Sequence, residues 1–404
     1  MDREALEKGA RQILLTNLRQ GVAEWNGQEY SFVCPSLTGY PFQWFWDSCF
    51  HAIALLHLDP EQAKAELRTL MSGALPNGFI PHIIFWEMEK QRDFLSRNIV
   101  GQTDPHYSST MQPPIIAYAV ERVYQATGDE EFKAMALPVL VNFYRWLRDT
   151  RDPDNDGLIA VIQPEEAGTD CSPKYDEALG LGELSNQGFV SALRKIYQAY
   201  EPLRGDDQKI LSADLFHFED VLVNSIYVMG MRSLVRLLGD STESAEFNCE
   251  AKRTLDALLE KCWDEEVGAF FDLSGIAEKP VRVVTISSLM PLILEDLPRP
   301  IVERLVNDWL SSPDHFGHLT HCHLYRRPIR NLCRAIPTVS YGEGLPGSIR
   351  IGFCTMLYAI TVTKNWLILS PPKVSNVSRN PALGSITILT LQRDWGPKTL
   401  AGQR

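Results

Sequence analysis

One segment of this 404-residue chain places four carboxylates within a loop rich in proline and glycine. It reads IQPEEAGTDCSPKYD over residues 162–176 and contains Glu165, Glu166, Asp170 and Asp176. Cleavage of a glycosidic bond needs one carboxylic acid to protonate the leaving oxygen and a second carboxylate to activate water or to attack. The segment offers candidates for both roles, although a solvated acidic loop would have the same composition.

A second segment has the residue types that hold sugars. It reads GYPFQWFWDSCFHA over residues 39–52 and places Trp44, Phe45 and Trp46 directly before Asp47. Aromatic faces cover the C–H side of a sugar ring, while a carboxylate and the amide of Gln43 could bind hydroxyl groups. The alternative is core packing, with Asp47 favourably placed near a helix N-terminus.

Two further patterns resemble metal sites without completing one. Asp152, Asp154, Asp156 and Gly157 match the first half of a calcium loop, but the twelfth position is Gln163 and not the usual bidentate glutamate. We interpret this segment as a tight turn.

The other pattern lies near the C-terminus. Its residue types suit zinc, but their spacing matches no common zinc pattern, and we treat them as accidental. The residues are His318, His321, Cys322, His323 and Cys333. We therefore predict no metal site and no cofactor.

Helices are the elements that would have to position these loops. They are expected at residues 47–58, 60–75, 108–126, 129–149, 184–200, 214–238, 241–263, 285–294 and 298–310, after an amphipathic helix at the N-terminus. No strand–helix alternation is found, which argues against a doubly wound sheet.

The helices alternate in character. Residues 113–118 and 283–294 are apolar nearly all round, whereas 130–148 and 243–261 are amphipathic. Alternating inner and outer helices favour an all-α fold, a two-layered (α/α) barrel of helical hairpins. A helical solenoid is the competing fold, but the sequence has no fixed repeat of about 34 or 40 residues.

Charge divides the chain at Phe316. Residues 317–404 contain only two carboxylates, Glu343 and Asp394, against eleven lysines and arginines, whereas residues 1–316 contain 49 carboxylates and 28 basic residues. One interpretation of residues 317–404 is a small basic module that touches nucleic acid. The other is that this tail is not the sequence with which the fold evolved.

The amino-acid composition indicates the cellular compartment and the kinds of partner to expect. Hydrophobic content of 45% and aromatic content of 10% fit a globular protein with a sizeable core. We expect no secretory signal, no membrane span and no nucleic-acid partner for the acidic body. The eight cysteines are scattered without a CxxC pair, which favours reduced thiols and a cytoplasmic location.

Five segments in order resemble glycoside hydrolase family 63, most closely its short bacterial branch that includes mannosylglycerate and glucosylglycerate hydrolases. They are QWFWDSCFHA, LPNGFIPHIIFW, QPPIIAYAV, EEAGTDCSPKYD and CWDEEVGAFFDL. The resemblance covers roughly residues 21–316. It implies an (α/α)6 barrel, here incomplete at its C-terminal end, and inverting hydrolysis of an α-glycosidic bond in a small glycoside such as a glycosylglycerate.

The resemblance also assigns site residues. It implies that Asp170 is the general acid. The implied substrate-binding residues are Tyr40, Gln43, Trp44, Trp46, Asp47, Gln112 and Glu166. Glu165 replaces the family's usual tryptophan and Cys171 its usual asparagine, which changes the neighbouring subsite and hence the substrate.

The family's base carboxylate lies near an EYYNP segment, ahead of GLGAKDFGWTA, and residues 317–404 contain neither. Synonymous codons for these residues, read in the shifted frame, restore WRGPTWINTNW from residues 341–351, EYYNP from 379–388 and EGLGAKDFGWT from 392–403. We therefore predict that residues 317–404 are either a reading-frame artefact or the product of a true inactivating frameshift that begins at Phe316–Gly317. On this hypothesis residues 1–316 are the catalytic domain, 317–404 are a frameshift product, and the chain as it stands is inactive.

Two other functions stay open at this point. One is an (α/α)6 sugar isomerase or epimerase that uses histidines near the barrel axis, and the other is a non-catalytic sugar-binding remnant with a basic tail. A small carbohydrate is the expected ligand in all three cases. The sequence leaves the oligomeric state open.

Overall fold

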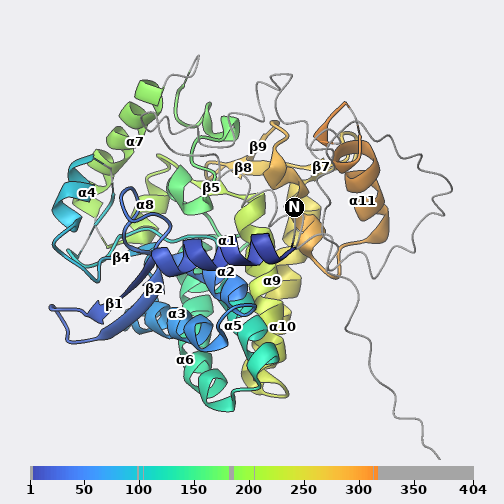
Figure 1. The fold of residues 1–404 in the computed structure, drawn as a ribbon. Coiled ribbons are helices and arrows are strands. Elements are labelled where there is room, and N and C mark those ends of the chain that lie inside the picture. The colour runs from blue at the N-terminus through green and yellow to red at the C-terminus, as the bar shows by residue number, and fades with distance from the viewer. Residues whose placement is uncertain are drawn as a thin grey trace, which may run out of the picture.

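A computed structural model describes residues 3–97, 100–102, 104–181, 186–203, 205–312 and 314–316. Within these residues the fold is rich in helices (Figure 1). The α-helices are α1 (Arg3–Thr16), α2 (Phe45–Leu55), α3 (Pro60–Ser72), α4 (Gln91–Arg97), α5 (Ile116–Thr127), α6 (Glu130–Arg151), α7 (Asn186–Tyr200), α8 (Asp207–Ser212), α9 (Val221–Leu238), α10 (Thr242–Ala257) and α11 (Arg299–Arg304).

Shorter helical turns join them. They are η1 (Pro164–Ala167), η2 (Pro173–Tyr175), η3 (Glu201–Leu203) and η5 (Ile286–Ile293), with π-helical extensions η4 (Leu258–Cys262) after α10 and η6 (Leu305–Leu310) after α11. The predicted helices at 60–75, 129–149 and 241–263 are thus confirmed within a few residues. Those at 285–294 and 298–310 are also helical, but largely as 3-10 and π turns.

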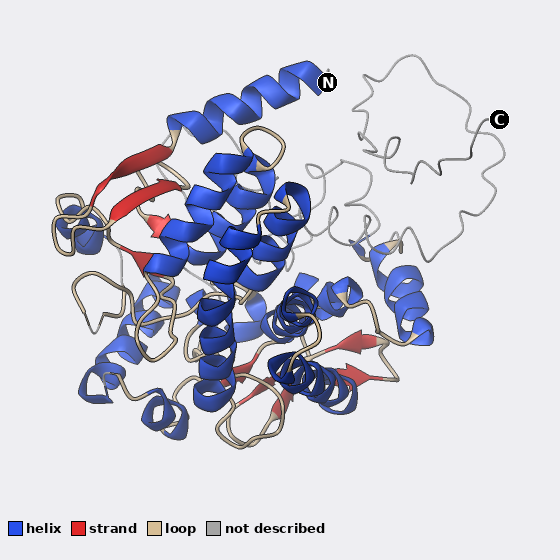
Figure 2. Ribbon diagram, turned by 90° about the horizontal axis from the view of Figure 1, so that it is seen from below, coloured by secondary structure: helices blue, strands red, loops and turns tan. Residues whose placement is uncertain are grey.

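Helices that follow one another in the chain pack in pairs, α2 with α3, α5 with α6 and α9 with α10. Helix α5 contacts both α2 and α9, so one helix of each pair forms a continuous row. Figure 2 shows these helices gathered in the middle of the fold and the short strands at its margins. The backbone amide of Trp46 in the first turn of α2 donates to Gln112, just ahead of α5, so the starts of these two helices lie close together.

Local signals fix where the helices begin. Asp59, Asp129 and Ser241 accept backbone hydrogen bonds from the first turns of α3, α6 and α10, and Pro60 occupies the first position of α3. These side chains satisfy amide groups that have no partner inside the helix.

Two predicted helices begin later than expected. Residues 108–115 are not helical, and α5 begins only at Ile116. Pro113 and Pro114 lack an amide proton and push the residue before them out of the α region. Residues 214–220 form a turn and a strand, and α9 begins at Val221 after its cap Asp220.

Short antiparallel strands complete the fold, and an expectation of helices alone omitted them. They are β1 (Leu18–Val22), β2 (Glu29–Val33), β3 (Gln43–Trp44), β4 (Ile83–Ile84), β5 (Phe218–Glu219), β6 (Trp263–Asp264), β7 (Ala269–Phe270), β8 (Asp272–Ser274) and β9 (Lys279–Val281). Strand β1 pairs with β2, β3 with β4 and β6 with β7, while β8 lies between β5 and β9. Most have two or three residues, too few to show an alternating pattern.

Helix α9 lies in the core. It is the one helix of the described segments that is long and apolar enough to cross a membrane, but most of it is buried inside the fold. Its length and composition therefore follow from its central position. The predictions for residues 317–404, including the zinc-like residue set and the frameshift, lie outside the described residues.

Candidate active site

Three segments that lie ahead of α2 and α5 in the chain are joined by backbone hydrogen bonds. Strand β3 of the first loop pairs with β4 of the second, and the amide of Phe45 donates to the carbonyl of His82 at 2.9 Å. The amide of His82 in turn donates to the carbonyl of Thr110 at 2.8 Å. These backbone hydrogen bonds hold the aromatic segment in a fixed position. The sequence alone could only place that segment before a helix.

Trp44 lies in a cluster of aromatic rings. Its ring meets those of Tyr40 at 5.3 Å and His82 at 4.9 Å, both nearly edge-on. Trp44 and Tyr40 remain partly exposed, whereas His82 is buried. The two partly exposed rings can therefore offer apolar faces to a ligand.

Trp46 joins the aromatic loop to the acidic loop. Its backbone amide donates to Oε1 of Gln112 at 2.9 Å. Its ring lies against Gly168, where a Cβ atom would come within 2.3 Å of two ring carbons, and Gly168 also has a left-handed φ of +67°. Only glycine fits both conditions, so Gly168 is needed to bring the acidic loop onto Trp46.

Asp170 and Asp47 come together at this contact. Burial raises the pKa of Asp170 to about 6. Burial also raises the pKa of Asp47 to about 7, and the negative charge of Asp170 adds to that increase. Two carboxyl groups from segments far apart in the sequence therefore lie in the same environment, which has little access to water, as acid–base sites require.

Glu165 is a third carboxyl group in this place. Burial and the charge of Asp170 raise its pKa to about 8, while a hydrogen bond from the Tyr197 hydroxyl to Oε2, at 2.7 Å, opposes the increase. The sequence singles out Glu165 as one of four loop carboxylates and as a departure from the family pattern. Its pairing with Tyr197, 32 residues away, could not be read from the sequence.

We expect Glu165 to make stability depend on pH. Because its pKa rises from an ordinary 4.5 to about 8 on folding, the folded state holds a proton that the unfolded state has lost between these values. Stability should therefore fall as pH rises through this window. A Glu165→Gln variant stays neutral, so its melting temperature should fall less over the same range.

The matched control is Glu177→Gln, because Glu177 is 81% exposed and contacts only solvent and the Lys279 ammonium at 2.6 Å. Thermal melts of the three proteins from below pH 4.5 to above pH 8 provide the measurement. Parallel pH profiles for the Glu165→Gln variant and the unmodified chain would contradict the assignment.

The sequence placed Gln43 against the sugar, but the structure buries it completely. Its Oε1 accepts from the indole of Trp86 at 2.7 Å, and its Nε2 donates to Ser48 Oγ at 3.1 Å and to the Glu66 carbonyl at 3.3 Å. All of its hydrogen-bonding groups therefore serve the protein. Gln43 supports the first loop from beneath.

Glu166 is likewise 0% exposed and lies in a buried ion pair. Its two oxygens accept from the guanidinium of Arg151 at 2.7 and 2.8 Å. The amides of Met111 and Ile162 also donate to it, at 3.0 and 2.8 Å. Glu166 thus connects the acidic loop to α6 and to the segment before α5.

The far end of the acidic loop is also anchored. The Lys174 ammonium is buried and contacts Asp220 at 2.5 Å and Asp272 at 3.3 Å, while the Tyr175 hydroxyl donates to Asp220 at 2.6 Å. Because Asp220 also caps α9, the loop is tied to the start of the central helix. Asp170 therefore lies between two fixed points, which limits how far it can move.

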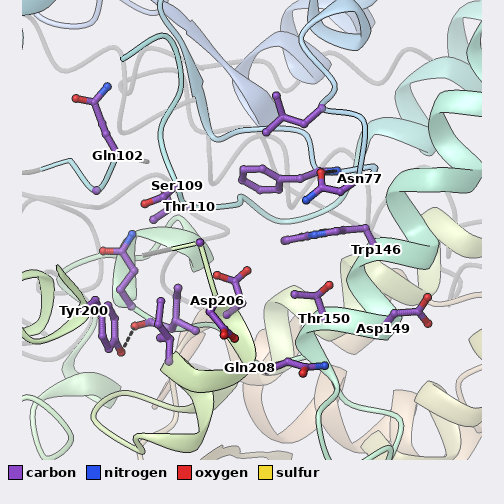
Figure 3. A pocket seen from close by; sticks show the side chains of 18 of the residues that line it. Asn77, Gln102, Ser109, Thr110, Trp146, Asp149, Thr150, Tyr200, Asp206 and Gln208 are labelled. Atoms are coloured by element: carbon purple, nitrogen blue, oxygen red, sulfur yellow. Dashed lines mark hydrogen bonds between the residues drawn. The ribbon is translucent and has the colours of Figure 1, made fainter. Parts of the chain in front are cut away.

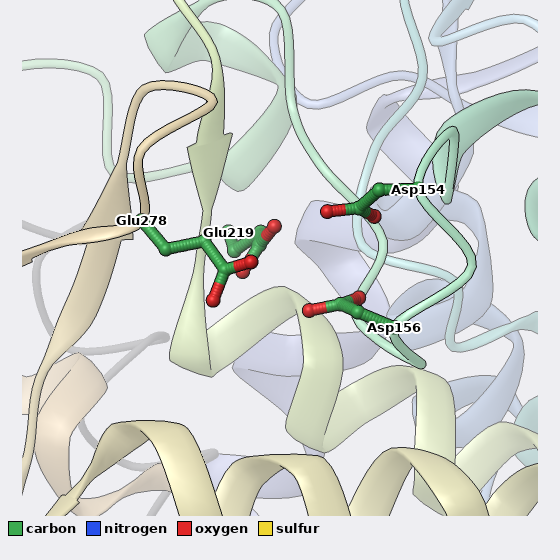
Figure 4. A group of neighbouring side chains, drawn as sticks. All are labelled: Asp154, Asp156, Glu219 and Glu278. Atoms are coloured by element: carbon green, nitrogen blue, oxygen red, sulfur yellow. The ribbon is translucent and has the colours of Figure 1, made fainter.

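The calcium-like segment adopts the turn that its residues predict. Asp152 accepts from the amides of Asp156 and Gly157 at 3.0 and 3.1 Å and from Arg253 at 2.8 Å. Asp154 and Asp156 point toward a group completed by two glutamates from β5 and the β8–β9 turn (Figure 4).

The carboxylate oxygens of this group lie within 4.8 Å of one another, a spacing that a metal ion could bridge. The group consists of Asp154, Asp156, Glu219 and Glu278. The ammonium of Lys261, however, contacts Asp156 at 2.5 Å and Glu278 at 2.8 Å. A lysine cation thus already holds two of the four carboxylates, and we assign no metal to the group.

Comparisons with known proteins agree with this geometry. Residues 40–322 match the mannosylglycerate hydrolase MGH1-like glycoside hydrolase domain. A mannosylglycerate hydrolase of Thermus thermophilus is 30% identical over 295 residues, which is 65% of this chain and 69% of that protein. A glucosylglycerate hydrolase of Mycolicibacterium hassiacum is 27% identical over 325 residues, 69% of this chain and 71% of the relative.

Solved structures are similar as well. The crystal structure of a family 63 mannosylglycerate hydrolase from Thermus thermophilus, in complex with Tris and D-glycerate, has a TM-score of 0.64 and 28% identity. The similarity covers 74% of this chain and 76% of that one. The domain match over residues 40–322 includes Trp46 and Gly168, where the aromatic and acidic loops meet, and the chain therefore belongs to the mannosylglycerate hydrolase-like family of glycoside hydrolases.

Proposed function

We propose that this glycoside hydrolase cleaves an α-glycosidic bond with inversion and that Asp170 is its general acid. The observation that carries the proposal is the position of Asp170 beside Asp47, at the point where the acidic loop meets Trp46, and burial there raises its pKa to about 6. A general acid must still hold its proton near working pH when the leaving oxygen arrives. Burial of Asp170 moves it toward that condition.

The aromatic rings of the loop that meets the acidic loop would form the wall of the sugar subsite. On this proposal Tyr40, Trp44 and Trp46 cover the C–H face of the sugar, and Asp47 binds its hydroxyl groups. Gln112 would act through the backbone amide of Trp46, which it binds at 2.9 Å. Gln43 and Glu166 would position these groups from behind, because both are fully buried and paired with protein atoms.

The fold proposed here is an (α/α)6 barrel that residues 1–316 leave incomplete. Three pairs, α2/α3, α5/α6 and α9/α10, provide hairpins of inner and outer helices. An inverting enzyme needs a base about 6.5–9.5 Å from the acid to hold the attacking water. We place that base in the segment that a restored reading frame would encode after Phe316, so the chain as it stands would lack it.

The substrate we propose is a small cytoplasmic glycoside such as a mannosylglycerate or glucosylglycerate, the compounds for which the relatives are named. No nucleic acid and no membrane would be involved. Glu165, where the family carries tryptophan, would distinguish this subsite, because a half-buried carboxyl replaces an aromatic face.

A hydrolase fits these residues better than an isomerase of the same barrel type. An isomerase that uses histidine as its acid would need a ring that can take up a proton near neutral pH. Burial instead lowers the pKa of His51 to about 4 and that of His82 to about 3, so both rings stay neutral. Both lie in or beside the aromatic loop.

The test is the stereochemistry of the product. A frame-restored enzyme is incubated with α-mannosylglycerate or α-glucosylglycerate, and proton NMR records which anomer of the sugar appears first. Inversion predicts the β-anomer, because water attacks from the face opposite the leaving group. Initial release of the α-anomer would exclude inversion, and sugar binding without turnover would favour the non-catalytic remnant.

A further inference from the structure

The short segment that carries Asp170 is closed by its own hydrogen bonds. The amide of Ser172 donates to the carbonyl of Thr169 at 2.8 Å, and the amide of Tyr175 donates to the carbonyl of Ser172 at 3.1 Å. The side chain of Tyr175 then returns to the start of the segment, because its hydroxyl oxygen lies 3.3 Å from that of Thr169. Asp170 therefore belongs to a compact turn, residues 169–175, whose two ends are joined by side chains.

The direction of the hydrogen bond between Thr169 and Tyr175 follows from a third group. The hydroxyl of Tyr175 has one proton, and it donates that proton to Oδ2 of Asp220 at 2.6 Å. Burial and the negative charge of Asp220 hold the pKa of Tyr175 well above its ordinary value, so the phenol keeps its proton. The phenol oxygen can then only accept from Thr169. A directed chain of hydrogen bonds thus runs from Thr169 through Tyr175 to Asp220.

Asp220 is a fixed end for this chain, because it is fully buried and bound from several sides. Its Oδ1 accepts from the amides of Leu222 and Val223 at 2.9 and 3.3 Å, as the cap of α9. Its Oδ2 also accepts from the buried ammonium of Lys174 at 2.5 Å. A carboxylate with so many donors has little freedom to move. The hydroxyl of Tyr175 therefore ties the turn to the start of the central helix.

The ring of Tyr175 is held separately from its hydroxyl. It is fully buried and meets the rings of Phe216 and Phe218 edge-on, with centroids 5.6 and 4.9 Å apart. These aromatic contacts do not depend on the phenol oxygen. A phenylalanine at this position would keep the packing and lose only the connection between Thr169 and Asp220.

We propose that Tyr175 is a positioning residue for Asp170 and that its hydroxyl acts through Thr169, the residue directly before the acid. The inference rests on the proposed function, in which Asp170 protonates the leaving oxygen. The hydrogen-bond chain keeps Asp170 beside Asp47 and away from water. Tyr175 and Thr169 are 0% and 3% exposed, so both act from behind the turn. Their role is geometric, since a general acid must lie within hydrogen-bond reach of the atom that it protonates.

The experiment removes one hydroxyl at a time from the full 404-residue chain, with Tyr175→Phe and Thr169→Val. Amide hydrogen exchange over residues 167–173 should become about tenfold faster in Tyr175→Phe, because the turn is no longer tied to α9. Carbon NMR of labelled aspartate follows the Asp170 carboxyl, whose signal is the one missing in Asp170→Asn. Its pKa should fall from about 6 toward the ordinary 3.8 as water reaches it.

Thr169→Val breaks the same chain from its other end and should change both quantities in the same direction. The double variant should differ little from Tyr175→Phe, because the two hydroxyls act in one line. Thr169→Val also keeps the test valid if Tyr175→Phe folds poorly.

Tyr200→Phe is the matched control. Tyr200 lines a cavity of about 670 Å³ beside α6 (Figure 3), and its hydroxyl donates to the carbonyl of Ile162 at 2.8 Å. This variant likewise loses a buried phenol hydrogen bond to the acidic loop, but ahead of Glu166, which Arg151 holds in place. Exchange over residues 167–173 and the titration of Asp170 should therefore match those of the unmodified chain.

In the frame-restored enzyme, Tyr175→Phe should lower kcat by about 10–10²-fold and leave KM nearly unchanged, because the acid moves while the sugar-binding rings do not. Unchanged exchange and titration in Tyr175→Phe, or equal changes in Tyr200→Phe, would exclude the positioning role. If both quantities change as expected but the frame-restored enzyme cleaves no glycoside, the proposed function fails and the positioning of Asp170 by Tyr175 stands.

Discussion

An Asp170→Asn change in the frame-restored enzyme is expected to lower kcat by about 10²–10⁴-fold, the usual contribution of a general acid. The amide cannot give a proton to the leaving oxygen, whereas its size and shape match those of the carboxylic acid. Sugar affinity should survive, because the aromatic faces of Tyr40 and Trp44 are unchanged. Steady-state rates on a glycosylglycerate and calorimetry with the free sugar measure the two quantities separately.

Glu177→Gln is the matched control for this change. Glu177 lies on the same loop, only seven positions after Asp170, but it is exposed and pairs with Lys279. Removing its charge should leave kcat nearly unchanged. If Asp170→Asn retained near-normal turnover, the acid would have to be another carboxyl of the cluster, and Glu165 and Asp47 would be the first to examine.

Restoring one base at Phe316–Gly317 is expected to convert an inactive protein into an active one. The present chain keeps the acid but, on this account, lacks the base that would activate water on the opposite face of the sugar. It would also lack the helices that close the barrel, so apolar surface of the inner helices would remain in water. The restored protein should therefore hydrolyse its substrate and unfold at a higher temperature.

A chain that ends at Phe316 separates the two effects of the tail. If residues 317–404 add nothing to the fold, the shortened chain and the 404-residue chain should have the same melting temperature, with the restored chain above both. Hydrolysis by the present chain at a rate similar to that of the restored one would show that the base lies within residues 1–316.

The helices could be predicted because their signals are local. Asp59 before Pro60, Asp129, and Ser241 mark helix starts within one turn of sequence, and each accepts the expected backbone hydrogen bond. The start of α5 was missed because a helical apolar pattern continued across Pro113 and Pro114, where the missing amide groups decide the conformation.

Site residues were harder to predict, because their roles depend on partners far away in the chain. Gln43 resembles a sugar ligand until Trp86, 43 positions later, is seen to bind its carbonyl. Glu166 resembles a catalytic neighbour until Arg151 is found buried against it. Carboxylates in a motif can be listed from sequence, but only the packing shows which face a ligand and which hold the scaffold together.

The same reasoning explains why the surroundings of Glu165 could not be predicted. Its unusual environment comes from three separate segments: its own turn η1, Asp170 five residues on, and Tyr197 of α7. Nothing in the local sequence distinguishes it from Glu166, its neighbour, which is fully paired. The two glutamates differ only in what the fold places around them.

The central claim is that this chain is a family 63-type hydrolase whose reading frame changes at Phe316. The measurement that tests it most directly is the nucleotide sequence of the gene across that codon and through the following 88 codons. The account predicts codons that spell HFWPPYPLPSV, then WRGPTWINTNW, then EYYNP and EGLGAKDFGWT, once a single T is restored. Codons that do not spell these segments in the shifted frame would contradict it, and the basic tail would then be a genuine part of the protein.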